Sequence, residues 1–299
     1  MYEKIMERTI AVLGGDARYL ELIRQLQILP NTTLLLVGFD RLEQGFTGFK
    51  QIEFQDLDLK KLDAIILPIT GTDSNGKIET TFSNEEIVLT RTWFEKLDES
   101  TIIFTGITNE YLTERTRELG IRLIPLLDRD DVAIYNSIPT AEGVIMMAIE
   151  HTDYTIHSSR VIVTGFGRVG HTVANKFSAF GAKVSVSANN SWEIARITEM
   201  GLTPIPTEKL YEHTSNCDIL INTVPAMVVD QRAISELPTN AIIIDVASKP
   251  GGTDFDYAKK RGIKAILTGS LPSIVAPKTA GRILADVIKQ ILLGEGSKS

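Results

Sequence analysis

The sequence predicts an α/β protein built from two doubly wound parallel-sheet domains. Three observations support this fold class. Short runs rich in β-branched residues alternate with helical patterns along the chain, which is typical of parallel sheets. One of these runs enters a Gly-rich turn, RVIVTGFGRVG (160–170), that opens a helix. The length of 299 residues suggests about two domains, each large enough for its own core.

Composition and charge exclude several classes of protein. Hydrophobic residues make up 43% of the chain and charged residues 23%, which excludes a disordered chain. The net charge of -7 argues against a nucleic-acid partner, because phosphate backbones require clustered Lys and Arg. The N-terminal segment has no apolar targeting core, and no apolar run approaches the length of a membrane span. We therefore expect a cytoplasmic protein with no membrane partner.

The single cysteine, Cys217, begins the apolar run CDILIN (217–222). It cannot form an internal disulfide, and we expect a small buried side chain and not a nucleophile. The sequence shows no metal-ligand cluster of Cys and His, so no metal is predicted.

In the first half, an alternating series of strands and helices predicts a parallel-sheet domain over residues 1–137 that is flavodoxin-like or Rossmann-like and binds the substrate. Strands are expected at 9–13, 33–37, 64–67, 101–104 and 121–124, with the polar stretch 40–58 as a connection. Helices are expected from near Arg18 and at 109–119. A capping-box pattern, SNEE (83–86), predicts a further helix that runs to about Leu97.

Two loops of this half are candidate substrate sites. GGDAR (14–18) has the turn of a nucleotide-binding start, but it lacks the third glycine and places Asp16 where it would repel a phosphate. Arg18 is then either a solvated residue of the first helical turn or a clamp for a carboxylate. Thr70, Gly71 and Thr72, after a strand end, could donate hydrogen bonds to a substrate carboxylate, or they belong to an ordinary loop.

Between the halves, the acidic run 128–131 predicts a surface loop, and Pro139 is expected to begin an apolar helix that reaches about His151. This helix and the last one, 277–293, are expected at the domain junction. Asn136 and Ser137 would then stand at the mouth of an interdomain cleft.

The second half, 138–299, is predicted to be a Rossmann domain that binds a dinucleotide. Gly165 allows the turn, Gly167 leaves room for a pyrophosphate, and Gly170 lets the helix approach the strand. The helix N-terminus would face the phosphates with free N–H groups. Further strands are expected at 183–187, 219–222, 241–245 and 264–267, with a helix at 191–200. The expected cofactor-binding residues are Gly165, Phe166, Gly167, Arg168, Val169, Gly170, Ser187, Ala188, Asn189, Thr223, Val224, Pro225, Val246, Ala247 and Ser248.

The residues after the second strand of this domain favour NADP over NAD. An NAD-binding fold normally places Asp or Glu there to bind the ribose hydroxyls, and 188–191 (ANNS) contains no carboxylate. Small polar groups and backbone N–H groups can instead bind a 2′-phosphate. An arginine for this phosphate is missing, so NAD stays an alternative.

Taken together, these motifs give the chain a family resemblance. GGDAR, the TGT loop (70–72), NSIPTAEG (136–143), GFGRVG, DVASKPGGTD (245–254) and APKTAG (276–281) occur in the order found in the A subunit of dipicolinate synthase from spore-forming bacteria, which the chain resembles over nearly its full length. Single motifs are shared with 2-hydroxyacid and alanine dehydrogenases.

The resemblance implies oxidation of dihydrodipicolinate to dipicolinate during sporulation, with NADP, in the cytoplasm of the mother cell. It also implies a separately encoded B subunit that looks like a flavoprotein. A homodimer is the default expectation for such folds.

This oxidation creates an aromatic ring, so we expect residues that position two carboxylates more than a strong base. The candidates for the catalytic positions are Arg18, Asn136, Ser137 and Lys249, and those for substrate binding are Thr70, Gly71, Thr72 and Lys278.

Two alternatives stay open. A 2-hydroxyacid or alanine dehydrogenase-like enzyme is one, although 2-hydroxyacid oxidation needs a base, usually His, and none of His151, His157, His171 and His213 follows Asp245. The other is a nucleotide-binding scaffold without chemistry of its own that serves a catalytic B subunit.

Overall fold

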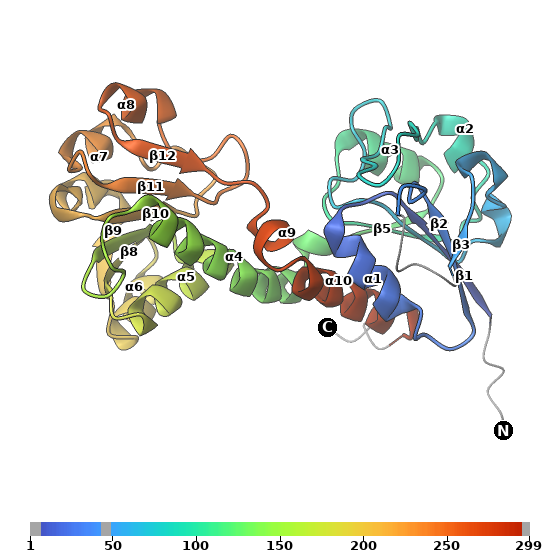
Figure 1. The fold of residues 1–299 in the computed structure, drawn as a ribbon, viewed down its shortest axis with the longest axis horizontal. Helices are drawn as coiled ribbons and strands as arrows, with labels where there is room; N and C mark the ends of the chain where they lie inside the picture. Colours follow the sequence, from blue (N-terminus) through green and yellow to red (C-terminus); the bar gives the residue numbers. More distant parts are fainter. Residues whose placement is uncertain (1–6, 43–48, 295–299) are drawn as a thin grey trace. The chain divides into compact units, whose positions relative to one another are not determined.

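The computed structural model describes residues 7–42 and 49–294, which fall into two units. The first unit is Met1–Val132 with Pro277–Ser299, and the second is Ala133–Ala276. Each unit contains a six-stranded parallel sheet flanked by helices (Figure 1). Numbered within its own unit, each sheet has the strand order 3-2-1-4-5-6, which is the Rossmann order. The predicted fold class is confirmed.

The first sheet runs β3-β2-β1-β4-β5-β6. Its strands are β1 Arg8–Leu13, β2 Thr32–Val37, β3 Lys50–Gln51, β4 Ala64–Ile66, β5 Ile102–Thr105 and β6 Arg122–Pro125. Its helices are α1 Ala17–Leu26, α2 Arg91–Phe94, α3 Glu110–Glu118 and α10 Pro277–Leu292, with 3-10 turns at Phe54–Asp56, Leu59–Lys61 and Leu126–Asp128. The stretch expected only as a connection, 40–58, therefore contains β3 and a 3-10 turn; its residues 43–48 lie outside the described residues.

The second sheet runs β12-β11-β10-β7-β8-β9. Its strands are β7 Arg160–Thr164, β8 Lys183–Ala188, β9 Thr203–Pro206, β10 Ile219–Asn222, β11 Ile242–Asp245 and β12 Lys264–Leu267. Its helices are α5 Arg168–Ala179, α6 Ser191–Glu199, α7 Gln231–Glu236, α8 Phe255–Lys260 and α9 Leu271–Val275, with 3-10 turns at Thr207–Glu212 and Thr214–Asn216. β9 and α7 to α9 were not among the expected elements.

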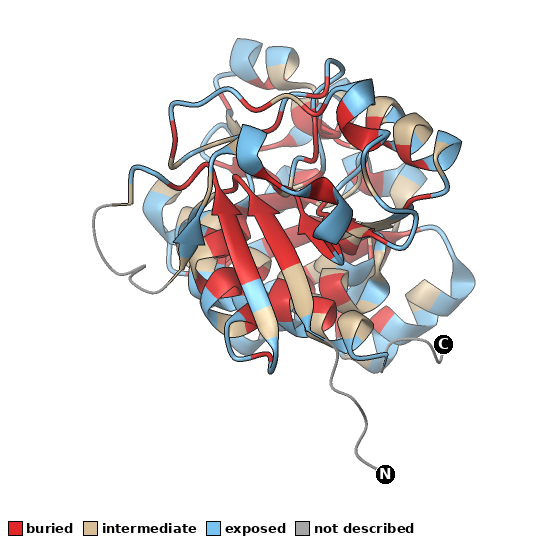
Figure 2. Cartoon of the chain, turned by 90° about the vertical axis from the view of Figure 1, so that its right-hand side faces the viewer, coloured by how far each residue is buried: buried red, intermediate tan, exposed pale blue. Residues whose placement is uncertain are grey.

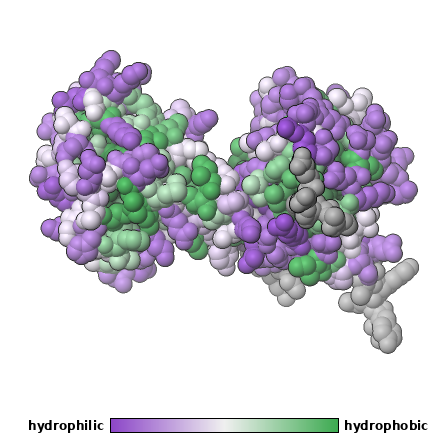
Figure 3. Space-filling view, in the orientation of Figure 1, coloured by the Kyte–Doolittle hydropathy of each residue, from purple (hydrophilic) through white to green (hydrophobic). Residues whose placement is uncertain are grey.

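The central strands are buried in continuous runs because both faces of each sheet are covered. Residues 10–13 of β1 and 219–222 of β10 have no exposed surface. Figure 2 faces the first unit and shows its strands buried along most of their length. In Figure 3, hydrophilic residues cover much of the drawn face of each unit, with hydrophobic patches between them.

The prediction of one helix over 83–97 is wrong. Ser83 accepts a hydrogen bond from the backbone N–H of Glu85, but no helix begins there. Ile87 and Leu89 are buried on either side of the less buried Val88, as in an extended chain, and this segment pairs with residues 76–78. Tertiary pairing with a neighbouring segment thus overrides the local capping pattern. The short α2 begins later, with Thr90 as its N-cap.

The helix α4, Asp130–His151, begins earlier than predicted, so that Pro139 lies inside it. Asp130 and Asp131 form its first turn, where carboxylates interact favourably with the helix dipole, and do not form a surface loop. By length and composition α4 could cross a membrane, which was not expected; 44% of its most apolar window is buried inside the structure, and a core helix passes the same test.

The boundary between the units falls within α4, between Val132 and Ala133, and not at 137–138. Val132 packs in the core of the first unit, whereas Ala141 and Val144 pack in that of the second. The C-terminal helix α10 also departs from the expected division, because it packs against α1 of the first unit. A side chain at Gly281 would collide with the carbonyl oxygen of Arg18, so the glycine permits this close packing.

Candidate functional site

The Gly-rich segment forms a tight turn between β7 and α5. Gly165 has φ +86°, and a Cβ there would lie 2.6 Å from Cγ2 of Val224. A Cβ at Gly170 would collide with the carbonyl oxygen of Gly165. These two glycines are therefore required by the fold itself, the first for its backbone conformation and both for close packing.

Gly167 differs from the other two glycines. A Cβ at this position would meet no protein atom within 4 Å. Gly167 is also the N-cap of α5, and as a glycine it supplies no side chain to bind the first N–H groups of the helix. The turn thus leaves open space at a helix N-terminus that no capping side chain occupies, which is the arrangement that a pyrophosphate requires.

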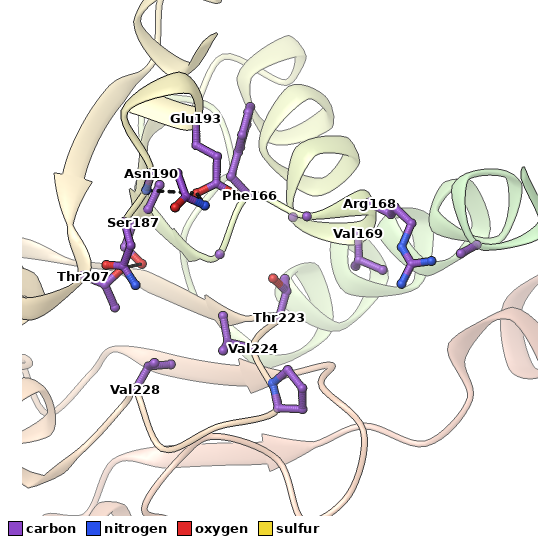
Figure 4. A pocket seen from close by; sticks show the side chains of 17 residues that line it. Phe166, Arg168, Val169, Ser187, Asn190, Glu193, Thr207, Thr223, Val224 and Val228 are labelled. Atoms are coloured by element: carbon purple, nitrogen blue, oxygen red, sulfur yellow. Dashed lines mark hydrogen bonds between the residues drawn. The ribbon is translucent and has the colours of Figure 1, made fainter. Parts of the chain in front are cut away.

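A cavity of about 450 Å³ lies over this turn at the carboxyl edge of the second sheet. Most expected cofactor residues line it: Gly165 to Gly170, Ser187, Ala188, Asn189, Thr223, Val224 and Pro225 (Figure 4). The residues fit a dinucleotide, with pyrophosphate at the N-terminus of α5 and adenosine ribose at the end of β8. We name this cavity the nucleotide pocket.

The pocket also contains residues that were not expected: Ala133, Asn190, Glu193, Thr207 and Val228. Glu193 corrects the view that this region offers no carboxylate. It follows 188–191 by two residues and reaches back, so that its Oε2 accepts hydrogen bonds from Nδ2 and the backbone N–H of Asn190 at 3.2 and 3.4 Å. The capping-box spacing from Asn190 to Glu193 is the sequence signal that could have revealed it.

Three polar residues stand in register at the ends of adjacent strands, beside the pocket. Thr164, Asn222 and Asp245 pair across β7, β10 and β11, and none has exposed surface. Thr164 donates to Oδ1 of Asn222 at 2.5 Å, and Nδ2 of Asn222 donates to Oδ2 of Asp245 at 2.9 Å. We name these three residues the strand-end triad.

Asp245 joins the triad to the loop that follows β11. Its carboxylate accepts bonds from the N–H groups of Ala247 and Gly252 and from the hydroxyl of Thr253, at 3.0, 2.9 and 2.7 Å. Gly252 in turn accepts from the N–H of Val228, a pocket residue. The buried carboxylate therefore fixes the shape of the loop and links it to the pocket wall.

Three expected cofactor residues, Val246, Ala247 and Ser248, do not line the nucleotide pocket. Ala247 is buried and its N–H is bound to Asp245, because the loop folds down onto this carboxylate. Lys249 follows on the exposed part of the loop, before a cis peptide bond to Pro250.

In the first unit, Arg18 already holds a carboxylate. Its Nε lies 3.0 and 3.1 Å from the two oxygens of Asp16, and the side chain is buried. Asp16 also caps α1 by accepting from the N–H of Arg18. The expected clamp for a substrate carboxylate is thus occupied by a residue of the chain.

The Thr70 to Thr72 loop is built with internal bonds as well. Thr70 is exposed and donates to Glu79 at 3.3 Å, whereas Thr72 is buried and bonded to Asn109. Gly71 has φ +65° and packs against the carbonyl oxygen of Ile107. Of the three, Thr70 is the residue exposed to solvent.

The remaining candidates lie on helices. Ser137 is buried within α4 and shares a 2.7 Å hydrogen bond with Thr172, so it holds α4 to α5. Oδ1 of Asn136 is buried without a partner. Lys278 is exposed in the first turn of α10. Asn136 and Ser137 thus lie within α4, which begins before the predicted start at Pro139.

The residues that line the nucleotide pocket include no histidine. Within 7–42 and 49–294, no group of three or more His, Cys, Asp or Glu side chains is arranged to hold a metal ion.

Cys217 is expected to be inert in the folded protein. Burial raises the pKa of its thiol from 9.0 to about 12, and the side chain is 1% exposed. The neutral thiol favours folding below pH 9, and this contribution is lost as the pH rises from 9 toward 12. Iodoacetamide at pH 8 should alkylate the protein only after unfolding, as followed by mass spectrometry. Alkylation of native protein at the unfolded rate would contradict this.

Comparisons with known proteins agree with this geometry. Residues 9–127 match the family model of the N-terminal domain of the dipicolinate synthase A subunit. Residues 140–249 match that of the D-isomer specific 2-hydroxyacid dehydrogenase, NAD binding domain. The second unit is accordingly a dehydrogenase-type domain for a nicotinamide coenzyme.

Relatives match along nearly the whole chain. The dipicolinate synthase A subunit of Bacillus subtilis (strain 168) is 50% identical over 283 residues, which cover 95% of both chains. The crystal structure of the dipicolinate synthase A subunit from Bacillus halodurans is 52% identical, with a TM-score of 0.92 and coverage of 95% of this chain and 97% of that one. The crystal structure from Bacillus subtilis is 49% identical, with a TM-score of 0.92 and 97% coverage of each. The chain therefore belongs to the family of dipicolinate synthase A subunits, as the sequence motifs predicted.

Proposed function

We propose that this chain oxidises dihydrodipicolinate to dipicolinate as the A subunit of a dipicolinate synthase. The observation that carries the proposal is the nucleotide pocket, with open space at Gly167, in a chain 50% identical to a dipicolinate synthase A subunit. The reaction removes a hydride and a proton from the dihydropyridine ring and leaves an aromatic product. A bound nicotinamide ring would accept the hydride, and the proton would pass to water.

The residues of the pocket support binding and orientation. Gly167 and the first N–H groups of α5 would hold the pyrophosphate, and the end of β8 would hold the adenosine ribose. The strand-end triad keeps the adjoining loops in place. Because the product is aromatic, positioning of the substrate contributes more than a strong base, which fits a pocket without histidine.

The substrate residues are part of the proposal. Lys249, Thr70 and Lys278 are the exposed candidates, and Asn136 and Ser137 complete the set with Arg18, Gly71 and Thr72. For Arg18, a substrate carboxylate would have to replace Asp16, so a supporting role in shaping the loop is the simpler assignment. The interdomain cleft stays a prediction.

Lys249→Ala should raise the KM for dihydrodipicolinate about tenfold, the effect of losing one charge-assisted hydrogen bond. Its KM for the coenzyme should stay unchanged, because Lys249 does not line the nucleotide pocket. Steady-state kinetics with freshly generated substrate measures both. Lys260→Ala, an exposed lysine in the last turn of α8, is the control. Unchanged substrate KM in Lys249→Ala would remove this lysine from the proposal.

We propose that the coenzyme is NADP and that the protein works in the cytoplasm of a sporulating cell. We propose further that it acts with a B subunit and forms a homodimer. The absence of a carboxylate from 188–191 supports NADP, whereas Glu193 in the pocket opposes it. The two coenzymes therefore have to be compared by direct binding.

The deciding experiment gives the purified chain NADP and freshly generated dihydrodipicolinate and records the absorbance of dipicolinate and of reduced coenzyme. Formation of both by this chain alone supports the proposal. If product forms only after a B subunit is added, the result favours the scaffold alternative. Turnover of a 2-hydroxyacid or alanine in place of dihydrodipicolinate would favour the other dehydrogenase alternative, to which the family match of 140–249 gives some support.

A further inference from the structure

The nucleotide pocket has one charged side chain on each of two sides. Arg168 begins α5, and Glu193 lies in the first turn of α6; no other lining residue is charged. Figure 4 shows Glu193 beside Asn190, near Ser187 and Thr207, with Arg168 away from them across the pocket. The negative charge therefore lies on the β8 side.

This side is where the two coenzymes differ. In a fold of this order the pyrophosphate lies at the first glycine-rich turn, and the adenosine ribose lies at the end of the second strand, here β8. NAD presents a 2′-hydroxyl there, and NADP presents a 2′-phosphate. A carboxylate accepts a hydrogen bond from the hydroxyl but repels the phosphate.

Asn190 restrains the Glu193 carboxylate. Both donors of Asn190, its backbone N–H and its side-chain amide, bind the same oxygen, Oε2. The bonds are long, at 3.4 and 3.2 Å, and the residue is half-buried, so this oxygen is held without being enclosed. Donors that occupy the carboxylate compete with a ribose hydroxyl for it and reduce its effective negative charge.

We propose that Glu193, held by Asn190, is the residue that sets the preference between NADP and NAD and that it limits the affinity for NADP. This inference rests on the proposed nucleotide binding. It assigns a specificity-determining role to a residue on α6, one turn beyond the usual position for a ribose-binding acid.

A charge series tests the assignment. The dissociation constants of NADP and NAD are measured by calorimetry on the full chain and on Glu193→Gln and Glu193→Lys. The ratio of NADP affinity to NAD affinity should rise about tenfold in the glutamine variant and further in the lysine variant, because each step makes the charge of a half-exposed site one unit more positive. Helix propensity does not predict this order, since all three residues are good helix formers.

Two more variants test the position of the charge on α6 and its restraint by Asn190. Glu199→Gln removes a carboxylate from the same helix, but Glu199 is exposed, bonded to Arg196 and outside the pocket. The ratio of NADP affinity to NAD affinity in Glu199→Gln should stay within about twofold of the ratio in the unsubstituted chain. Asn190→Ser keeps a helix-capping hydroxyl but removes the amide donor, so the carboxylate keeps only the backbone donor of residue 190 and should lower the ratio about threefold.

The outcomes are distinct. If both coenzymes bind and neither glutamine nor lysine at 193 changes the ratio, the inference is overturned while nucleotide binding stands. If Glu199→Gln changes the ratio as much as Glu193→Gln, long-range charge and not the pocket residue is responsible, and the inference is overturned. If neither coenzyme binds the unsubstituted chain, the proposed function and the inference fail together. A graded rise from Glu to Gln to Lys, with Glu199→Gln unchanged, supports it.

Discussion

Replacing Gly167 with aspartate is expected to weaken nucleotide binding at least about 100-fold without unfolding the protein. The added side chain meets no protein atom within 4 Å, so the fold tolerates it. Its carboxylate would occupy the pocket and bind the first N–H groups of α5, which are the donors that a pyrophosphate uses. The loss corresponds to roughly 3 kcal/mol of binding free energy.

The first unit already shows this arrangement. Asp16 is the N-cap of α1 and accepts from the N–H of Arg18, in the turn that follows the first strand of that unit. Gly167→Asp would make the start of α5 similar to the start of α1. Capping by an aspartate usually stabilises a helix by about 1 kcal/mol, so the melting temperature should stay unchanged or rise slightly.

Calorimetry with NADP and NAD measures the affinity, and thermal unfolding measures the stability. Gly269→Asp is the matched control, because a Cβ there also meets nothing within 4 Å and Gly269 does not line the pocket. It should bind nucleotide normally. Retention of full affinity by Gly167→Asp would show that the pyrophosphate does not lie at this turn.

Local signals allow much of the second unit to be predicted from its sequence. A β-branched strand, three glycines at fixed spacing and an amphipathic helix all lie within 160–180, and each feature agrees with the others. The central strands of both sheets could also be predicted, because their continuous apolar runs identify them without knowledge of the neighbouring strands. This is why the fold class and most of the pocket could be predicted.

Features that depend on distant partners could not be predicted. The segment 83–90 has a helical capping pattern, but its extended form is selected by pairing with 76–78. The last helix, α10, completes the first unit because Gly281 lets it approach α1, a contact that joins residues far apart in the sequence. Local propensity is a weak guide wherever tertiary contacts compete with it.

Side-chain direction is the other feature that the sequence order does not reveal. The order of residues after β8 shows no carboxylate in 188–191, and it does not show that the side chain of Glu193 returns toward that strand end. Val246 to Ser248 were expected to line the pocket because they follow β11. Their loop instead bends toward the Asp245 carboxylate, which accepts hydrogen bonds from the N–H groups of Ala247 and Gly252. An acidic residue at the end of the apolar run AIIID (241–245) was the available signal, since a buried carboxylate needs several donors.

Replacing Asp245 with alanine is expected to lower the unfolding free energy of the second unit by about 4 kcal/mol. The carboxylate has no exposed surface and accepts bonds from Asn222, Ala247, Gly252 and Thr253. Its removal leaves buried donors without an acceptor, and hydrogen bonds to a charged group contribute about 1.5–3 kcal/mol each before the structure relaxes. Asp245→Asn keeps the shape but puts an amide among donors, so it should be intermediate.

Urea unfolding followed by circular dichroism measures the loss, and hydrogen exchange with mass spectrometry locates it. Exchange should accelerate in 223–229 and 246–254, which the carboxylate joins, and stay unchanged in the first unit. Asp230→Ala is the control: Asp230 caps α7, is only partly buried, and its loss should cost about 1 kcal/mol. If Asp245→Ala and Asp230→Ala lose the same unfolding free energy, the strand-end triad does not hold the pocket wall in place. Unchanged hydrogen exchange in both loops of Asp245→Ala would mean the same.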